Sequence, residues 1–234
     1  LQAFLNTGFP ASRIDDIIVA TSSNRDNFPS IASGLHSLIL RINDGCGTTD
    51  ISNACTGFAT GLKYASYAAL AGRRTLVVGT ERLTDYLDPE DRNSNLFGDG
   101  ASACVIGPSS HGGGVLSIAS MTDSTAKDLI FQDKDGYLRL DGPKVFEKAV
   151  DGVFDTTKRA LEDAGFSSKD LTYFIGHNAN KRILDRVSRK MRKIGCDAET
   201  LSTIKYSGNT STASIGLTLD KYIRDGTIHR GDLI

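Results

Sequence analysis

The segment Gly8-Phe9-Pro10-Ala11-Ser12-Arg13-Ile14 recurs in the second half of the chain as Gly165-Phe166-Ser167-Ser168-Lys169-Asp170-Leu171. In the same alignment, Ile17-Ile18-Val19-Ala20 falls on Phe174-Ile175-Gly176-His177. Internal similarity at such a spacing indicates a duplicated unit whose copies bury their faces against each other. We therefore expect two similar halves that face one another.

Carried further along the chain, with a small loop adjustment, the alignment places Cys55 opposite Asn209. His177 closes the aligned strand of the second copy. Because the two copies face each other, a residue from each can converge on one pocket. The duplication thus predicts Cys55, His177 and Asn209 as a catalytic trio.

The composition is that of an ordinary globular protein. With 234 residues, 39% of them hydrophobic, the chain can bury a core. Lys and Arg number 27 against 28 Asp and Glu, so the net charge of −1 gives no reason to expect nucleic acid or a membrane surface as a partner. No apolar run is close to the length of about 20 residues that a helix needs to span a bilayer.

The four cysteines are scattered along the chain without a C-x-x-C pair. This spacing predicts neither a metal site nor a disulfide framework. It favours a reducing, cytoplasmic setting.

Short β-branched runs alternate with helical patterns along the chain. Ile14–Ala20 and Thr75–Val78 predict buried strands, and Gly57–Leu70 predicts a helix that ends before a glycine. This alternation is typical of an α/β protein whose mainly parallel sheets are covered on both faces.

One glycine-rich segment, Gly107–Gly114, resembles a linker and is the best boundary between the copies. We therefore expect an N-terminal half at residues 1–112, which carries the cysteine, and a C-terminal half at residues 113–234, which carries the histidine and the asparagine.

Cys55 lies where a predicted strand ends and a helix begins, within Asn53-Ala54-Cys55-Thr56-Gly57-Phe58. A thiol at a helix N-terminus lies near free N–H groups and the positive end of the helix dipole. Both favour the thiolate and lower its pKa from about 8.5 into the range of roughly 3.5–7.5. This position predicts a nucleophile, whereas we interpret Cys46, Cys104 and Cys196 as structural cysteines.

His177 and Asn209 each have a structural alternative. His177 directly follows the predicted strand Leu171–Ile175, and strand ends that face a crevice are where α/β proteins place their sites. Its imidazole can exchange protons there, although it could equally be a loop histidine without a special role. Asn209 lies in a cluster typical of a helix N-cap. Its amide can also hold a carbonyl oxygen on which charge develops, and the alignment with Cys55 favours that role.

Four motifs follow one another along the chain: the segment around Cys55, Phe97-Gly98-Asp99-Gly100-Ala101, Gly176-His177-Asn178-Ala179-Asn180 with Arg182, and Gly208-Asn209-Thr210-Ser211. In this order they resemble the motifs of the β-ketoacyl-acyl carrier protein synthase III family. The resemblance covers essentially the whole chain. It implies a thiolase-like fold, a duplicated α/β sandwich of two pseudo-symmetric halves layered α-β-α-β-α, and a Cys-His-Asn triad.

The resemblance also implies the reaction of an acyltransferase. Cys55 would attack an acyl-coenzyme A thioester and hold the acyl group. His177 and Asn209 would bind the thioester carbonyl of malonyl-acyl carrier protein and stabilise the enolate left after loss of CO2. The Cys55 amide would be one oxyanion donor, and a glycine outside this chain the other. The products would be 3-oxoacyl-acyl carrier protein, CO2 and free coenzyme A, with coenzyme A entering only as substrate and no cofactor.

Four further positions are implied as substrate-binding. Phe28 resembles a residue that family members lend across a homodimer interface to cap the neighbour's acyl pocket. Arg92 resembles an arginine that stacks on adenine at the coenzyme A entrance. Arg182, with Asn180 beside it in the histidine motif, resembles a residue at the tunnel mouth that meets the carrier protein. Aromatic packing, a solvated loop charge and a surface helix arginine are the structural alternatives for Phe28, Arg92 and Arg182.

Some features depart from the family pattern and leave alternatives open. Asn178 stands where the family usually has Gln, and the region Asp123–Leu140 is short and unusual.

Four alternative functions were weighed. Relatives that move an acyl group from Cys to an alcohol or amine keep the triad, and a catalytically silent partner subunit is a further possibility. A papain-like hydrolase has no reason for internal duplication. A nucleotide-binding module lacks its glycine spacing in Gly107–Gly114.

Both ends of the chain match the repeat incompletely. Leu1–Leu5 predicts only the end of a helix, and Asp232–Ile234 matches Leu76–Val78, a strand that has more sheet after it in the first copy. We expect an opening strand-helix region and a closing glycine-rich strand in the natural protein, outside this chain.

Overall fold

The computed structural model describes residues 9–24, 26, 28–40, 45–110 and 112–234. The helix end expected at residues 1–5 lies outside the described residues.

A four-stranded sheet forms the first half. Its strands are β1 (Asp16–Ala20), β2 (Gly47–Ile51), β3 (Thr75–Glu81) and β4 (Gly100–Ile106), in the order β2-β1-β3-β4. β1 pairs in parallel with β2 and β3, and β4 is antiparallel to β3. Most side chains of β1 and β3 are buried, as their apolar runs predict for strands covered on both faces.

Helices pack on both faces of this sheet. α2 (Ile31–Ile39) contacts β1 and β2, and α3 (Gly57–Leu70), which has the predicted bounds, contacts β1 and β3. α3 lies very close to the sheet at Gly61, where a Cβ would come within 2.7 Å of Val77 Cγ1. The absence of a side chain at Gly61 therefore allows the close approach.

The second half repeats this plan in a smaller form. β7 (Tyr173–Phe174) pairs in parallel with β8 (Glu199–Thr200). α4 (Gly142–Asp163) and α5 (Lys181–Arg192) pack against each other, and α7 (Ser214–Arg224) contacts β4 of the first half. The buried core of this half is formed by Val150, Leu161, Leu171, Phe174, Ile183, Leu184, Val187, Met191 and Cys196.

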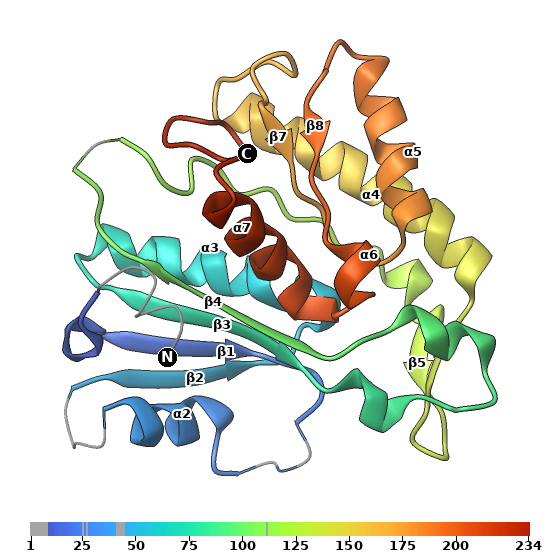
Figure 1. Cartoon of the computed structure of the whole chain (residues 1–234), viewed down its shortest axis with the longest axis horizontal. Coiled ribbons are helices and arrows are strands. Elements are labelled where there is room, and N and C mark those ends of the chain that lie inside the picture. The colour runs from blue at the N-terminus through green and yellow to red at the C-terminus, as the bar shows by residue number, and fades with distance from the viewer. Residues whose placement is uncertain (1–8, 25, 27, 41–44, 111) are drawn as a thin grey trace.

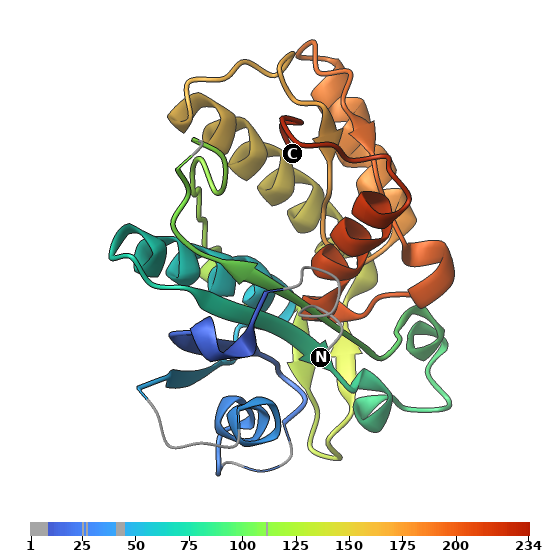
Figure 2. The ribbon, with the colours of Figure 1, turned by 60° about the vertical axis from the view of Figure 1, so that its left-hand side comes forward.

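Figure 1 shows the elements in successive layers: α2, the sheet β2-β1-β3-β4, α3 with α7, the pair β7-β8, and α4 with α5. Figure 2 shows the same separation of α2 from α4 and α5 in a rotated view. This is the predicted α-β-α-β-α order. The two helices that follow the candidate residues Cys55 and Asn209 form its middle layer.

A hairpin not anticipated from sequence lies in the unusual region before α4. β5 (Ile130–Gln132) and β6 (Leu138–Leu140) are antiparallel. Arg139 of β6 pairs with three carboxylates, those of Asp88, Asp91 and Asp133. The pairs with Asp88 and Asp91 tie the hairpin to the loop between β3 and β4, and the pair with Asp133 lies within the hairpin. The other short helices are η1 (Ala11–Arg13), η2 (Ala54–Thr56), η3 (Leu83–Tyr86), η4 (Arg92–Leu96), η5 (Ser124–Ala126), α6 (Ile204–Ser207) and η6 (Ser211–Ala213).

Backbone hydrogen bonds support the duplication at the first strand of each half. Asp15 N–H donates to the carbonyl oxygen of Arg74 at 2.8 Å, and Thr172 N–H donates to that of Leu233 at 2.8 Å. Leu233 therefore occupies the position of Arg74, whereas the sequence alignment matched it with Val77. The second copy has a longer loop before this point, which shifts the match.

A second shift occurs at the candidate site. Ala54 and Ser211 have φ angles of 44° and 45°, and each is the first residue of a short turn that leads into a long helix. By backbone geometry Ser211 is thus the counterpart of Ala54, and Thr212 is the counterpart of Cys55. The predicted match of Cys55 with Asn209 is wrong, although both residues remain at the junction of the halves.

Candidate active site

Cys55 lies in η2, the short turn between β2 and α3. Ala54, directly before it, has a φ of 44°, which costs an L-residue about 1–2 kcal/mol. Ala54 N–H donates to Ser22 Oγ at 3.1 Å, and this bond helps hold the strained residue. The chain turns sharply here, and the thiol lies directly before the N-terminus of α3.

Several groups act on the pKa of the Cys55 thiol. Burial, the largest influence, raises the pKa; the nearby His177 lowers it, mainly through its charge, and Ser211 lowers it by donating to Sγ at 3.6 Å. The Glu81 carboxylate raises it. The net pKa lies below the ordinary value, so this thiol ionises readily, whereas burial raises the pKa of Cys104 to about 12.

The hydrogen bonds of Ser214 fix the tautomer of His177. Ser214 Oγ donates its only proton to the Ser211 carbonyl oxygen at 2.9 Å and accepts from Asn178 N–H at 3.2 Å. His177 Nδ1, 2.8 Å from the same Oγ, must therefore be the donor. The neutral ring then carries its lone pair on Nε2, which is buried and makes no hydrogen bond of standard geometry among the described residues, although His177 lies close enough to Cys55 to lower the pKa of its thiol.

Asn209 is held by the loop before β4, which contains the Phe97-Gly98-Asp99-Gly100 motif. Its N–H donates to the carbonyl oxygen of Leu96 at 2.8 Å, and its own carbonyl oxygen accepts from Gly98 N–H at 3.0 Å. Asn209 Oδ1 accepts from Ser211 N–H at 2.9 Å. Its Nδ2 has no hydrogen bond recorded within the described part of the chain, so two N–H donors are available to a ligand.

Known proteins are similar to this sequence over its whole length. The family model of 3-oxoacyl-[acyl-carrier-protein (ACP)] synthase III matches residues 49–124, and the model of its C-terminal part matches residues 161–234. The β-ketoacyl-[acyl-carrier-protein] synthase III of Geobacillus kaustophilus is 37% identical over 236 residues, which are 100% of this chain and 74% of that protein. That of Staphylococcus aureus strain Newman is 37% identical over 239 residues and covers 100% and 75%. The chain belongs to the synthase III family.

Solved structures extend this likeness to the fold. The synthase III of Aquifex aeolicus superposes with a TM-score of 0.90 at 31% identity, covering 98% of this chain and 74% of that one. The priming β-ketosynthase of the R1128 polyketide pathway superposes with a TM-score of 0.87 at 33% identity, covering 98% and 72%. The predicted thiolase-like α/β fold is thereby confirmed, and the chain is a synthase III-type acyltransferase.

The structure gives this synthase a buried role for Asn178, the departure from the family motif. Its side chain is fully buried, and Nδ2 donates to Thr218 Oγ1 at 2.8 Å and to the Ser214 carbonyl oxygen at 3.3 Å. Ser202 Oγ donates to Asn178 Oδ1. Asn178 therefore anchors the loop of His177 to α7.

The four expected substrate-binding residues of the synthase lie on its surface or at a helix start. Phe28, Arg92 and Arg182 are exposed, and no hydrogen bond or ion pair between described residues joins them to the triad. Asn180 is the N-cap of α5, with Oδ1 accepting from Arg182 N–H at 2.9 Å. Capping is thus the contact that the structure shows for Asn180.

Three residues around the triad were not singled out from sequence: Glu81, Ser211 and Ser214. The sequence did contain a signal for Glu81 as a site residue. Its carboxylate closely follows the apolar run Thr75–Val78, where we predicted that the strand ends. β3 continues to Glu81, which is 2% exposed. A buried acid at the end of a central strand indicates a polar site at that edge. The two serines gave no such signal, since each reads as part of a helix start.

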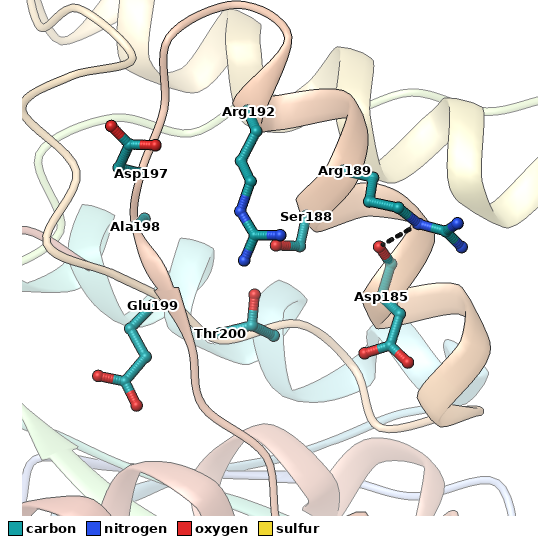
Figure 3. Close-up of a pocket in the computed structure, with 8 residues that line it drawn as sticks. All are labelled: Asp185, Ser188, Arg189, Arg192, Asp197, Ala198, Glu199 and Thr200. Atoms are coloured by element: carbon teal, nitrogen blue, oxygen red, sulfur yellow. Dashed lines mark hydrogen bonds between the residues drawn. The ribbon is translucent and has the colours of Figure 1, made fainter.

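The described residues also form an open pocket between α5 and β8 (Figure 3). Its volume is about 630 Å³. Its lining residues are Asp185, Ser188, Arg189, Arg192, Asp197, Ala198, Glu199 and Thr200. Charges of both signs line it and no triad residue does, so we assign it no part in the reaction.

Within the described ranges, no group of three or more His, Cys, Asp or Glu side chains is placed to hold a metal ion. No helix there has the length and apolar character to cross a membrane.

Replacing Ser214 by alanine removes the acceptor that fixes the tautomer of His177. We expect turnover to fall about 10- to 100-fold, because the ring can then rotate or carry its proton on Nε2. Steady-state kinetics measure the turnover, and a thermal unfolding curve shows whether the variant is folded. Ser66→Ala, which removes a partly buried serine bond on α3, is the matched control. Wild-type turnover in a folded Ser214→Ala variant would contradict the tautomer assignment.

Proposed function

We propose that this synthase catalyses the decarboxylative condensation of an acyl group, taken from acyl-coenzyme A, with malonyl-acyl carrier protein. The observation that carries the proposal is the thiol of Cys55, whose lowered pKa depends on the adjacent His177. Ser211 contacts this thiol through its hydroxyl and Asn209 Oδ1 through its N–H. These contacts support a site at the junction of the two halves with Cys55 as nucleophile, His177 as proton acceptor and Asn209 as amide donor.

In the first step Cys55 takes the acyl group. His177 Nε2 accepts the thiol proton, and the thiolate attacks the acyl-coenzyme A carbonyl carbon. The C–S bond to coenzyme A breaks, and the leaving thiolate takes a proton from solvent. The Cys55 N–H, which has no partner recorded among the described residues, is the proposed donor to the oxyanion. The enzyme now holds an acyl thioester beside a protonated His177.

In the second step the malonyl group loses CO2. The electrons of the broken C–C bond form an enolate, whose oxygen accepts hydrogen bonds from His177 Nε2–H and Asn209 Nδ2. The enolate carbon attacks the acyl carbon on Cys55, and the C–S bond breaks to return the thiolate. The tautomer set by Ser214 explains why His177 must be protonated to act as this donor. The product is 3-oxoacyl-acyl carrier protein.

Exposed residues support the proposed partners. Phe28 is 84% exposed, as expected for a residue that caps the acyl pocket of a second copy in a homodimer. Arg92 at the start of η4 is assigned to the adenine of coenzyme A. Arg182 at the start of α5 is assigned to the carrier protein.

We also propose that the boundary between the two halves lies between residues 112 and 113.

We propose a cytoplasmic setting for the protein. The four cysteines form no disulfide bond, which supports this setting.

Intact mass spectrometry of the full-length protein tests the function. We expect one acyl adduct after exposure to a panel of acyl-coenzyme A thioesters, and its loss with release of CO2 when malonyl-acyl carrier protein is added. An adduct that clears only with an alcohol or amine would replace the synthase by a transferase. Absence of any adduct would indicate a silent subunit.

A further inference from the structure

Glu81 is a buried acid that the proposed mechanism does not use. It is the last residue of β3 and only 2% exposed, yet no ion pair is recorded for it among the described residues. Burying a carboxylate without a cation is costly unless several donors satisfy it. The retained acid therefore calls for a role that an apolar side chain could not fill.

The carboxylate connects the two halves of the molecule. Ser22 N–H donates to both of its oxygens, at 3.2 and 3.1 Å, and Thr21 Oγ1 donates at 3.4 Å. From the second half, Ser211 Oγ donates to Oε1 at 3.3 Å. Glu81 thus fixes the loop after β1 and the first residue of η6 at once.

The same Ser211 hydroxyl also faces the nucleophile, with Oγ 3.6 Å from Cys55 Sγ. A hydroxyl has one proton, so it can donate to the carboxylate or to the sulfur but not fully to both. When Cys55 is a thiolate, Glu81 and the sulfur compete for this proton. When Cys55 is acylated, the sulfur is neutral and the proton goes to Glu81.

We propose that Glu81 is a positioning residue, which holds the Ser211 hydroxyl and thereby limits how strongly that hydroxyl stabilises the Cys55 thiolate. The consequence is a thiolate that keeps more of its nucleophilicity than one held fully by the Ser211 hydroxyl proton. This inference rests on the proposed nucleophilic role of Cys55.

The charges around the thiol support this assignment. Among the described residues, those that act on it are His177, from the end of β7, and Glu81, from the end of β3. His177 lowers the pKa of Cys55 and Glu81 raises it, while the Ser211 hydrogen bond lowers it. His177 and Glu81 therefore act on the thiol in opposite directions, and only Glu81 also contacts the Ser211 hydroxyl.

Glu81→Gln tests the proposal while nearly preserving shape. The Gln side-chain oxygen can still accept from Ser22 N–H, and its amide nitrogen can donate to Ser211 Oγ. The hydroxyl proton is then free for the sulfur. We expect the pH midpoint of Cys55 alkylation by iodoacetamide to fall by about 0.5–1 unit. Peptide mass mapping follows Cys55 alone, and thermal unfolding reports whether the variant is folded.

A double-mutant cycle separates action through Ser211 from the bare charge of Glu81. Ser211→Ala alone is expected to raise the midpoint. In the Ser211→Ala background, Glu81→Gln should shift the midpoint by less than half as much as it does alone, because only the through-space effect remains. Equal shifts in both backgrounds, no shift, or an upward shift with Gln would overturn the proposal.

Glu81→Asp covers the case in which the Gln variant does not fold. It keeps the charge but shortens the side chain by one methylene, so a carboxylate held by Ser22 no longer reaches Ser211. The midpoint is expected to fall here as well, and an unchanged midpoint would contradict the proposal. Alkylation needs no acyl donor, so these results stand apart from whether the synthase reaction itself is confirmed.

Discussion

Cys55→Ala is expected to form no acyl adduct with any acyl-coenzyme A and to lose condensation by at least about 10³-fold. The reason is that the Cys55 thiol combines a lowered pKa with a place beside His177, whereas burial raises the pKa of Cys104. Intact mass after acyl-coenzyme A exposure and product formation with malonyl-acyl carrier protein are the measurements.

Two comparisons make this result specific to Cys55. Cys104→Ala should retain the adduct, because burial raises the pKa of that thiol to about 12 and keeps it protonated. In Cys55→Ala itself, release of CO2 from malonyl-acyl carrier protein should persist without a primer, with His177 taking its proton from solvent instead of from the thiol, since His177 and Asn209 remain. An adduct of normal yield in Cys55→Ala would mean that another residue is the nucleophile.

His177→Ala is expected to lower condensation by about 10²–10⁴-fold, because it removes both the proton acceptor and one donor to the enolate. It should also raise the pKa of Cys55. His177 lowers that pKa in the native protein, and burial, the largest influence, raises it, so loss of the histidine leaves burial less opposed. The pH midpoint of Cys55 alkylation should therefore move upward, and acylation at pH 7 should slow.

His229→Ala is the matched control, since His229 is an exposed histidine in the same half. It should leave both the midpoint and turnover unchanged. A His177→Ala variant that is folded, loses condensation and keeps the wild-type midpoint would contradict the assignment of His177 to the thiol, and would leave it a role at the malonyl carbonyl alone.

The sequence was most informative where a local pattern is sufficient. Gly57–Leu70 has the predicted helix bounds because Gly72, with a φ of 80°, follows its C-cap residue and ends the helix. The central strands were placed correctly by their apolar runs. The hairpin β5-β6 was missed, because its side chains are at least partly exposed and its attachment depends on Arg139 and carboxylates distant in sequence.

The duplication was informative about the fold and misleading about one residue pair. The halves correspond at β1 and β7, yet Cys55 corresponds to Thr212 in backbone geometry rather than to Asn209. A loop in one copy can lengthen without changing the strands, so alignment by strands carries its error forward. The catalytic role of the three triad residues stays a prediction. The variants of Cys55 and His177 described above test two of them.

The sequence by itself determined the layered α/β class, the family and the placement of Cys55 at a helix start, because these depend on periodicity and on short motifs. Only the tertiary structure decided how the thiol is tuned. Ser211 meets Cys55 across 156 residues and Glu81 across 130, and Ser214 meets His177 across 37. Hydrogen bonds of this kind depend on atoms brought together by packing of the halves, and no local pattern in the chain records them.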